Sequence, residues 1–144
     1  TEIKAKGGGT PLMIFQSMHF GPEFINFSRQ DPKNKENVDN FVWTPNTGWQ
    51  GPKVGKLSGG GKLEDNLFNI DDVNWDAIPV FIAETEKLAK ENGIEKASLG
   101  SSIMINFNVR KQTLSFSATV KGERKDAYST GDVQTGKVTN FRVK

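Results

Sequence analysis

The clearest hydrophobic pattern in the chain lies over residues 74–93 and has the period of an α-helix. Its apolar positions form one stripe, made of Ile78, Phe81, Ile82, Leu88 and Ala89. Asn74 or Asp76 can accept hydrogen bonds from the free N–H groups at the start, and Pro79 is tolerated only in the first turn. Asn92-Gly93, followed by an apolar residue, is typical of a Schellman-type end. The pattern therefore predicts a helix that begins near Asp76 and packs on a core.

The first part of the chain predicts an antiparallel meander. Strand character is found over residues 12–20, 23–28, 38–44 and 49–57, and polar turns lie at 31–37 and 45–48. Residues 12–20 are apolar without clean alternation, but their short length and the following Gly21-Pro22 favour a strand. Gly51-Pro52 interrupts the last of the four strands.

The second part alternates with period two. One face of the predicted strands carries Ile103, Ile105, Phe107, Val109, Leu114, Phe116, Ala118 and Val120. The opposite face carries Ser102, Met104, Asn106, Asn108, Ser115, Ser117 and Thr119, which we expect to be exposed to solvent. Two further strands are predicted over residues 127–132 and 138–143, joined by a tight turn at 134–137.

These elements predict an α+β fold in which one long amphipathic helix packs on one face of antiparallel sheet meanders. Residues 1–10 are polar and rich in glycine, so we expect a flexible N-terminal tether there. Residues 11–57 form the first meander and residues 58–144 the helix with the second, and the Gly-rich segment 58–62 marks the boundary between the halves. We expect residues 11–144 to form one compact domain.

The two halves also resemble each other in sequence. Residues 25–28 (INFS) match 114–117 (LSFS), 39–41 match 126–128, and 46–48 match 134–136, at offsets of 89, 87 and 88. The pattern is either a tandem repeat of a helix and four strands, with the first helix missing or upstream of Thr1, or the common chemistry of two meanders.

Composition excludes several classes of function. The formal net charge is only +2, with acidic and basic residues interspersed, so a general nucleic-acid surface is not expected. The absence of cysteine excludes disulfides, thiolate catalysis and cysteine-ligated zinc. No apolar run is as long as the roughly 18 residues of a membrane span. The tether-like start is what remains after a signal peptide or lipid anchor is removed, or it is simply a disordered end.

Phe41, Trp43 and Trp49 cluster around one turn and form the best candidate binding surface for a ligand or partner. The alternative is that these aromatic residues close the end of a core. His19 is the only histidine, so a Ser-His-Asp triad or a histidine-rich metal site has at most one possible histidine member, and we interpret His19 as a half-buried strand residue. The acidic residues before the helix, around Asp71-Asp72, lack the spacing of a calcium loop. We therefore predict no catalytic residues, no metal and no cofactor.

The second half, from Trp75 to Val143, resembles the PepSY-like pattern of bacterial extracytoplasmic proteins. In that pattern an amphipathic helix ending in glycine precedes an antiparallel meander, and the last hairpin reads as an aromatic residue, then Asp, then T-G-K-V. Here these elements are Tyr128, Asp132 and Thr135-Gly136-Lys137-Val138. The resemblance covers about half of the chain, and it implies an exported protein, often lipid-anchored or periplasmic, with a binding or inhibitory role.

From these observations we expect a non-enzymatic extracytoplasmic domain of a bacterium, tethered to the membrane, that binds or inhibits a protein partner or another component of the cell envelope. The alternative is a module that binds a small ligand or carbohydrate, either at the Trp43/Trp49 loop or in a pocket between helix and sheet. No transmembrane span and no nucleic-acid partner are expected.

Overall fold

The computed structural model describes residues 2–7 and 11–144. The chain divides into two compact units. The first comprises Thr1–Asp72 and Phe107–Thr113, and the second comprises Val73–Asn106 and Leu114–Lys144. The segment 58–62, which the sequence indicated as a boundary, lies inside the first unit. That residues 11–144 form one domain stays a prediction.

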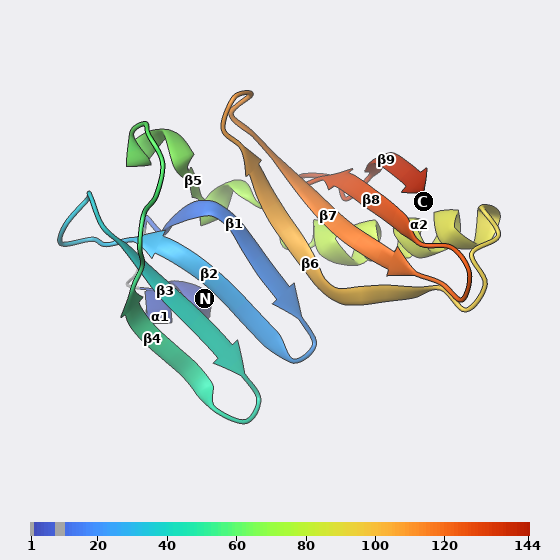
Figure 1. The fold of residues 1–144 in the computed structure, drawn as a ribbon, viewed down its shortest axis with the longest axis horizontal. Helices are drawn as coiled ribbons and strands as arrows, with labels where there is room; N and C mark the ends of the chain where they lie inside the picture. Colours follow the sequence, from blue (N-terminus) through green and yellow to red (C-terminus); the bar gives the residue numbers. More distant parts are fainter. Residues whose placement is uncertain (1, 8–10) are drawn as a thin grey trace. The chain divides into compact units, whose positions relative to one another are not determined.

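The first unit is built on a meander of antiparallel strands (Figure 1). Its elements are α1 (Glu2–Gly7), β1 (Met13–Gly21), β2 (Phe24–Gln30), β3 (Val38–Thr44), β4 (Gly48–Val54) and β5 (Leu67–Asn69), with 3-10 turns at Leu63–Asn66 and Ile70–Asp72. The strand order is β4-β3-β2-β1, and β5 pairs with β1. The predicted meander is therefore confirmed, and β3 has the bounds expected from the sequence.

The start of the chain differs from the flexible tether that we expected over residues 1–10. Glu2–Gly7 form the short helix α1, while residues 1 and 8–10 lie outside the described part. Two side-chain contacts join α1 to the rest of the first unit. The Glu2 carboxylate accepts a hydrogen bond from the indole N–H of Trp49 at 3.1 Å, and Lys4 forms an ion pair with Asp71. Sequence composition alone does not reveal such long-range partners.

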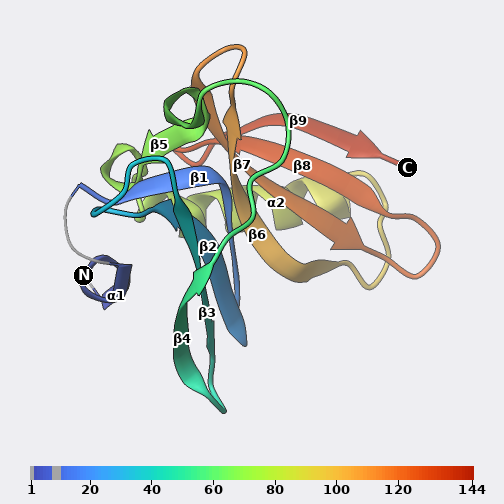
Figure 2. The same ribbon diagram turned by 60° about the vertical axis from the view of Figure 1, so that its left-hand side comes forward.

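The second unit consists of one main helix and four antiparallel strands. Its elements are α2 (Ala77–Glu91), β6 (Ser98–Asn108), β7 (Thr113–Lys121), β8 (Ala127–Asp132) and β9 (Val138–Val143), in the order β6-β7-β8-β9. Figure 2 shows α2 running behind these strands. The predicted α+β class is confirmed, with the sheet as the dominant element.

Both ends of α2 follow the signals in the sequence. Asn74 Oδ1 accepts a hydrogen bond from the backbone N–H of Asp76 at 3.1 Å, whereas the Asp76 side chain makes no capping bond. At the other end Gly93 has φ +66°. Its N–H donates to the Lys90 carbonyl, and the N–H of Ile94 donates to the Ala89 carbonyl, each at 3.0 Å. This is the Schellman arrangement that was predicted.

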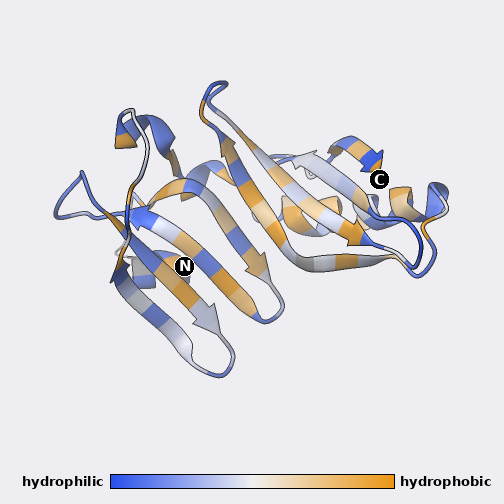
Figure 3. Ribbon diagram, viewed as in Figure 1, coloured by the Kyte–Doolittle hydropathy of each residue, from blue (hydrophilic) through white to orange (hydrophobic). Residues whose placement is uncertain are grey.

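The core of the second unit lies between α2 and its strands. Phe81 and Phe116 are fully buried, and their ring centroids are 5.5 Å apart. Toward the C-terminal end of the helix, Ala89, Ile94, Val120 and Ala127 form a second buried cluster. Figure 3 shows hydrophobic and hydrophilic residues alternating along the strands, as half-buried strands require.

Thr85 is a buried polar residue on the helix face that the hydrophobic pattern did not include. It is fully buried, and its hydroxyl lies 2.9 Å from the equally buried hydroxyl of Ser129 on β8. Either hydroxyl can donate in this hydrogen bond, which offsets part of the cost of burying the two polar groups.

Replacing Thr85 with valine should therefore lower the free energy of unfolding by about 1–3 kcal/mol, because the Ser129 hydroxyl loses its partner. The double variant Thr85→Val/Ser129→Ala should recover most of this loss, since no unpaired donor remains. Urea unfolding of the two single variants and the double variant measures the difference. If the loss in the double variant equals the sum of the losses in the two single variants, the two hydroxyls are not paired.

The polar face of β6 and β7 is less exposed than the alternation predicted. Ser117 is fully buried, and its hydroxyl accepts a hydrogen bond from the Asn106 amide at 2.6 Å. Met104 is half-buried, and only Asn108 is exposed on the β6 side of this face. The expectation of a uniformly solvent-exposed face is therefore wrong at Ser117, because period two separates the two faces of a strand but does not show what covers them.

The two meanders can also be compared by strand register. In the first unit Phe27 lies opposite Phe41. According to the sequence alignment, Phe116 corresponds to Phe27 and Tyr128 to Phe41, so Phe116 should lie opposite Tyr128. It lies instead opposite Gly131, which is three residues further along the chain (131 against 128). In each unit a helix precedes four consecutive strands. The register does not support the residue-by-residue alignment, however, and the repeat is not confirmed.

Candidate functional site

The structure brings together the three aromatic residues that the sequence indicated. Trp43 on β3 lies directly opposite Trp49 on β4. Phe41 lies two residues before Trp43 and so faces the same side of the strands. All three residues belong to the first unit.

Their surroundings divide them into a core part and an accessible part. Phe41 is only 3% exposed and stacks on Phe27, with ring centroids 5.3 Å apart and an interplanar angle of 12°. The ring centroids of Trp49 and Phe27 are 6.0 Å apart, and the two ring planes lie at 71° to each other. Trp43 and Trp49 are half-buried. Phe41 therefore belongs to the core, whereas parts of the two indoles remain available for contact. Binding of a partner there stays a prediction.

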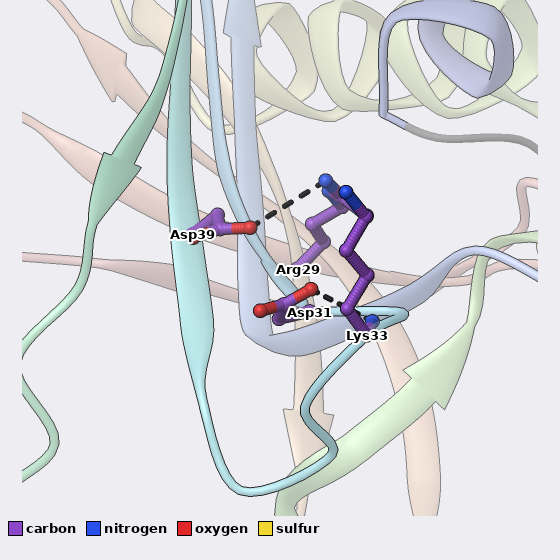
Figure 4. Close-up of polar contacts among 4 residues, drawn as sticks. All are labelled: Arg29, Asp31, Lys33 and Asp39. Atoms are coloured by element: carbon purple, nitrogen blue, oxygen red, sulfur yellow. Dashed lines mark hydrogen bonds and ion pairs between the residues drawn. The ribbon is translucent and has the colours of Figure 1, made fainter.

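Arg29 is a functional candidate that the reading of the sequence missed. It lies on β2 on the same face as Phe27, and its guanidinium carbon is 5.2 Å from the centroid of the Phe41 ring. Figure 4 shows its side chain directed toward the carboxylate of Asp39 on β3, with 3.5 Å between Arg29 Nη2 and Asp39 Oδ2. Strict alternation after Ile25 and Phe27 was the available signal, because it places Arg29 on the buried face.

The second unit carries a separate concavity of about 390 Å³ between the end of α2 and its strands. Its apolar wall is formed by Ala89, Ile94, Leu99 and Val120. Charged side chains stand at its margin, namely Glu86, Lys90 and Lys96. This is a helix–sheet pocket of the kind that a small apolar molecule with a polar end could occupy.

Two carboxylates have clearly shifted pKa values, and turns explain both. Asp132 accepts hydrogen bonds from the backbone N–H groups of Thr135 and Gln134, each at 2.8 Å, and these bonds lower its pKa. The hydrogen bond from Lys121 lowers the pKa of Asp126. A carboxylate with a lowered pKa is a weak proton acceptor near neutral pH, so both groups stabilise turns.

Other candidates from the sequence lie elsewhere. His19 is half-buried on β1, and its Nε2 is 3.4 Å from the Ser17 hydroxyl. In the described ranges, no group of three or more His, Cys, Asp or Glu side chains is placed to hold a metal ion, and this includes the acidic residues near Asp71. Within the same ranges, none of the helices has the length and apolar character to cross a bilayer.

Comparison with known proteins yields a likeness in fold. No protein-family model matches the chain, and no curated protein matches it. A crystal structure from Clostridium difficile 630, described as that of a "putative lipoprotein", superposes with a TM-score of 0.61. The likeness covers 93% of this chain and 84% of the other, at 10% sequence identity. At that identity the comparison establishes a shared fold.

Proposed function

We propose that this chain is a non-enzymatic extracytoplasmic domain of a bacterium, tethered to the membrane, that binds or inhibits a protein partner. The observation that carries the proposal is the likeness in fold to the Clostridium difficile protein, which extends over 93% of the chain. That protein is described as a "putative lipoprotein", and this description supports the extracytoplasmic location that we propose for this chain.

The PepSY-like pattern forms part of the same proposal. It is supported by the last hairpin, where Asp132 accepts hydrogen bonds from the turn and Gly136 has φ +77°. A side chain is unfavourable at such a φ, so the T-G-K-V motif has a structural reason at its glycine. The tandem repeat is also proposed, because a helix precedes a four-stranded meander in each unit.

The proposed partner surface is the pair of half-buried indoles, Trp43 and Trp49. Aromatic residues that are partly exposed beside a packed core are typical anchors of protein interfaces. Asp126 and Asp132, the two carboxylates with lowered pKa values, lie in turns of the second unit and are not part of this surface.

Location is tested in the native bacterium with the complete gene product. Protoplasts or spheroplasts are treated with a protease that does not enter intact cells, and the protein is followed by immunoblot. We expect it to be digested while a cytosolic marker stays intact. If it resists digestion until the cells are lysed, the extracytoplasmic proposal is wrong.

The partner surface is tested by placing a photoreactive phenylalanine analogue at position 43 in the same cells. We expect a discrete cross-linked protein that is lost when Trp49 is replaced with alanine. The same analogue at Lys87, an exposed position on α2, serves as the control. Equal products from positions 43 and 87 would contradict a specific surface at the indoles.

The second candidate function is binding of a small apolar ligand, and the concavity of about 390 Å³ beside Leu99 favours it. A fluorescent anilinonaphthalene sulfonate probe should bind there and gain intensity. Ala97 is exposed and lines this concavity, so Ala97→Trp should fill it and reduce the gain at least about fivefold. An unchanged gain in the variant would exclude this pocket as the site.

A further inference from the structure

Arg29 is a buried cation whose hydrogen bonding is incomplete. Its side chain is only 10% exposed. A guanidinium group offers five N–H donors, yet the contact with Asp39 is long, at 3.5 Å, and Nε has no hydrogen-bond partner among the described residues. Buried charges are normally paired and fully hydrogen-bonded. The guanidinium therefore has unused hydrogen-bonding capacity, although its Nε atom is itself enclosed by the surrounding protein.

Arg29 forms part of the wall of a cavity of about 380 Å³ in the first unit. Apolar side chains of Leu12, Met13 and Pro32 line the same cavity, together with two charged side chains, Asp31 and Lys35. The cavity thus combines an apolar surface with a buried cation, which is the usual composition of a small-ligand site.

Two other polar side chains at this cavity, those of Asp31 and Gln30, already have hydrogen-bond partners. Asp31 Oδ1 accepts a hydrogen bond from the backbone N–H of Lys33 at 2.8 Å (Figure 4). Gln30 Nε2 donates to the carbonyl of Lys35 at 2.8 Å. The face of Phe41 supports the guanidinium from one side. Arg29 is therefore held in place while one of its donors stays unused.

We propose that this cavity binds a carboxylate carried on an apolar body, with the carboxylate hydrogen-bonded to Arg29 and the body against Leu12, Met13 and Pro32. The planar guanidinium suits a carboxylate better than an ammonium group does, because its N–H donors match the two oxygens. Lys35 also lines the cavity, and its positive charge offsets the repulsion between the Asp31 carboxylate and a bound carboxylate. The source of the carboxylate is either a free apolar acid or the C-terminus of a peptide. This site is independent of the cellular location proposed above.

The experiment uses the whole chain and nuclear magnetic resonance, with the side-chain Nε–H signal of Arg29 as the direct reporter. The free-acid probe is hexanoate, and the peptide probe is N-acetyl-Ala-Ala-Leu with a free carboxylate. Each is compared with its neutral amide. We expect at least one acid to shift the Arg29 Nε–H signal saturably, and its amide to bind at least about tenfold more weakly. The acid that binds identifies the source.

Three variants test whether binding depends on the residues of the cavity or only on the positive charge of the nearby surface. Arg29→Lys keeps the charge but removes the fork of donors, so we expect affinity to fall about tenfold to a hundredfold. Lys35→Gln should weaken binding about twofold to fivefold. Lys33→Gln removes the same charge from an exposed neighbour that does not line the cavity, and it should change affinity by less than about twofold.

Three results would overturn the proposal. They are the absence of binding by both acids, equal binding of acid and amide, and retention of wild-type affinity by Arg29→Lys. If Arg29→Lys does not fold, the comparison of Lys35→Gln with Lys33→Gln and the Nε–H signal of the wild-type protein decide the question.

Discussion

Replacing Phe81 with alanine is expected to lower the free energy of unfolding by about 3–5 kcal/mol. Phe81 is fully buried on α2 and packs against Phe116, which is also fully buried. It also lies against Gly131, where a Cβ atom would come within 2.5 Å of its ring. Removing the ring therefore opens a cavity at a point where the helix packs closely on the strands. Urea denaturation followed by circular dichroism measures the loss.

Val80 provides a matched control for Phe81. It is the preceding residue of the same helix and is 47% exposed. Val80→Ala removes apolar atoms without opening a buried cavity, and alanine is the better helix former, so a change within about 0.5 kcal/mol is expected. A loss below about 1 kcal/mol for Phe81→Ala would show that α2 is not packed on its strands as described.

Replacing Gly136 with alanine is expected to cost about 2–4 kcal/mol, the sum of backbone strain and overpacking. Gly136 has φ +77°, a backbone conformation that residues with a Cβ atom rarely adopt. A Cβ at this position would lie 2.8 Å from the Cβ of Val80 and even closer to the carbonyl oxygen of Ala77. The turn between β8 and β9 would have to move away from the start of α2.

A variant at Gly93 allows the backbone strain at Gly136 to be distinguished from the overpacking there. It has φ +66°, and a Cβ there would meet nothing within 4 Å. Gly93→Ala therefore carries backbone strain alone, and its expected cost is about 1–2 kcal/mol. Thermal unfolding of both variants gives the comparison. If Gly136→Ala is no worse than Gly93→Ala, the close approach of this turn to the helix is wrong.

The sequence predicted best where local chemistry decides the structure. The ends of α2 depend on Asn74 and Gly93, whose preferences for caps act within a few residues. The strands β3, β8 and β9 have the bounds that alternation and turn residues indicated. In each case the information needed lies inside the element or next to it.

The prediction failed where contacts between residues far apart in the sequence determine the local structure. The short helix α1 was read as a tether, since its contacts with Trp49 and Asp71 come from residues far along the chain. The apolar stretch of β1 lacked clean alternation because its pairing with β2 shifts between Ile14 and Met18, and Gln16 within that shift has φ +56°. Such irregularities have no reliable local signal.

The candidate site was predictable in part. Turn position and strand register were enough to group Trp43 with Trp49, but the burial of Phe41 depends on its stacking with Phe27 from another strand. Arg29 was overlooked because a charged residue near the end of a strand usually lies in solvent. Its burial is set by residues from several segments, which the sequence does not show to be neighbours.

The strand β4, at one end of the strand order, has a consequence for the behaviour of the protein at high concentration. A free strand edge is a template on which a second chain can add and begin a fibril. Pro52 has no N–H group to donate, and its position within β4 interrupts the row of donors that a regular strand would present. The terminal strand of the first unit is thus a poor template for intermolecular β-aggregation.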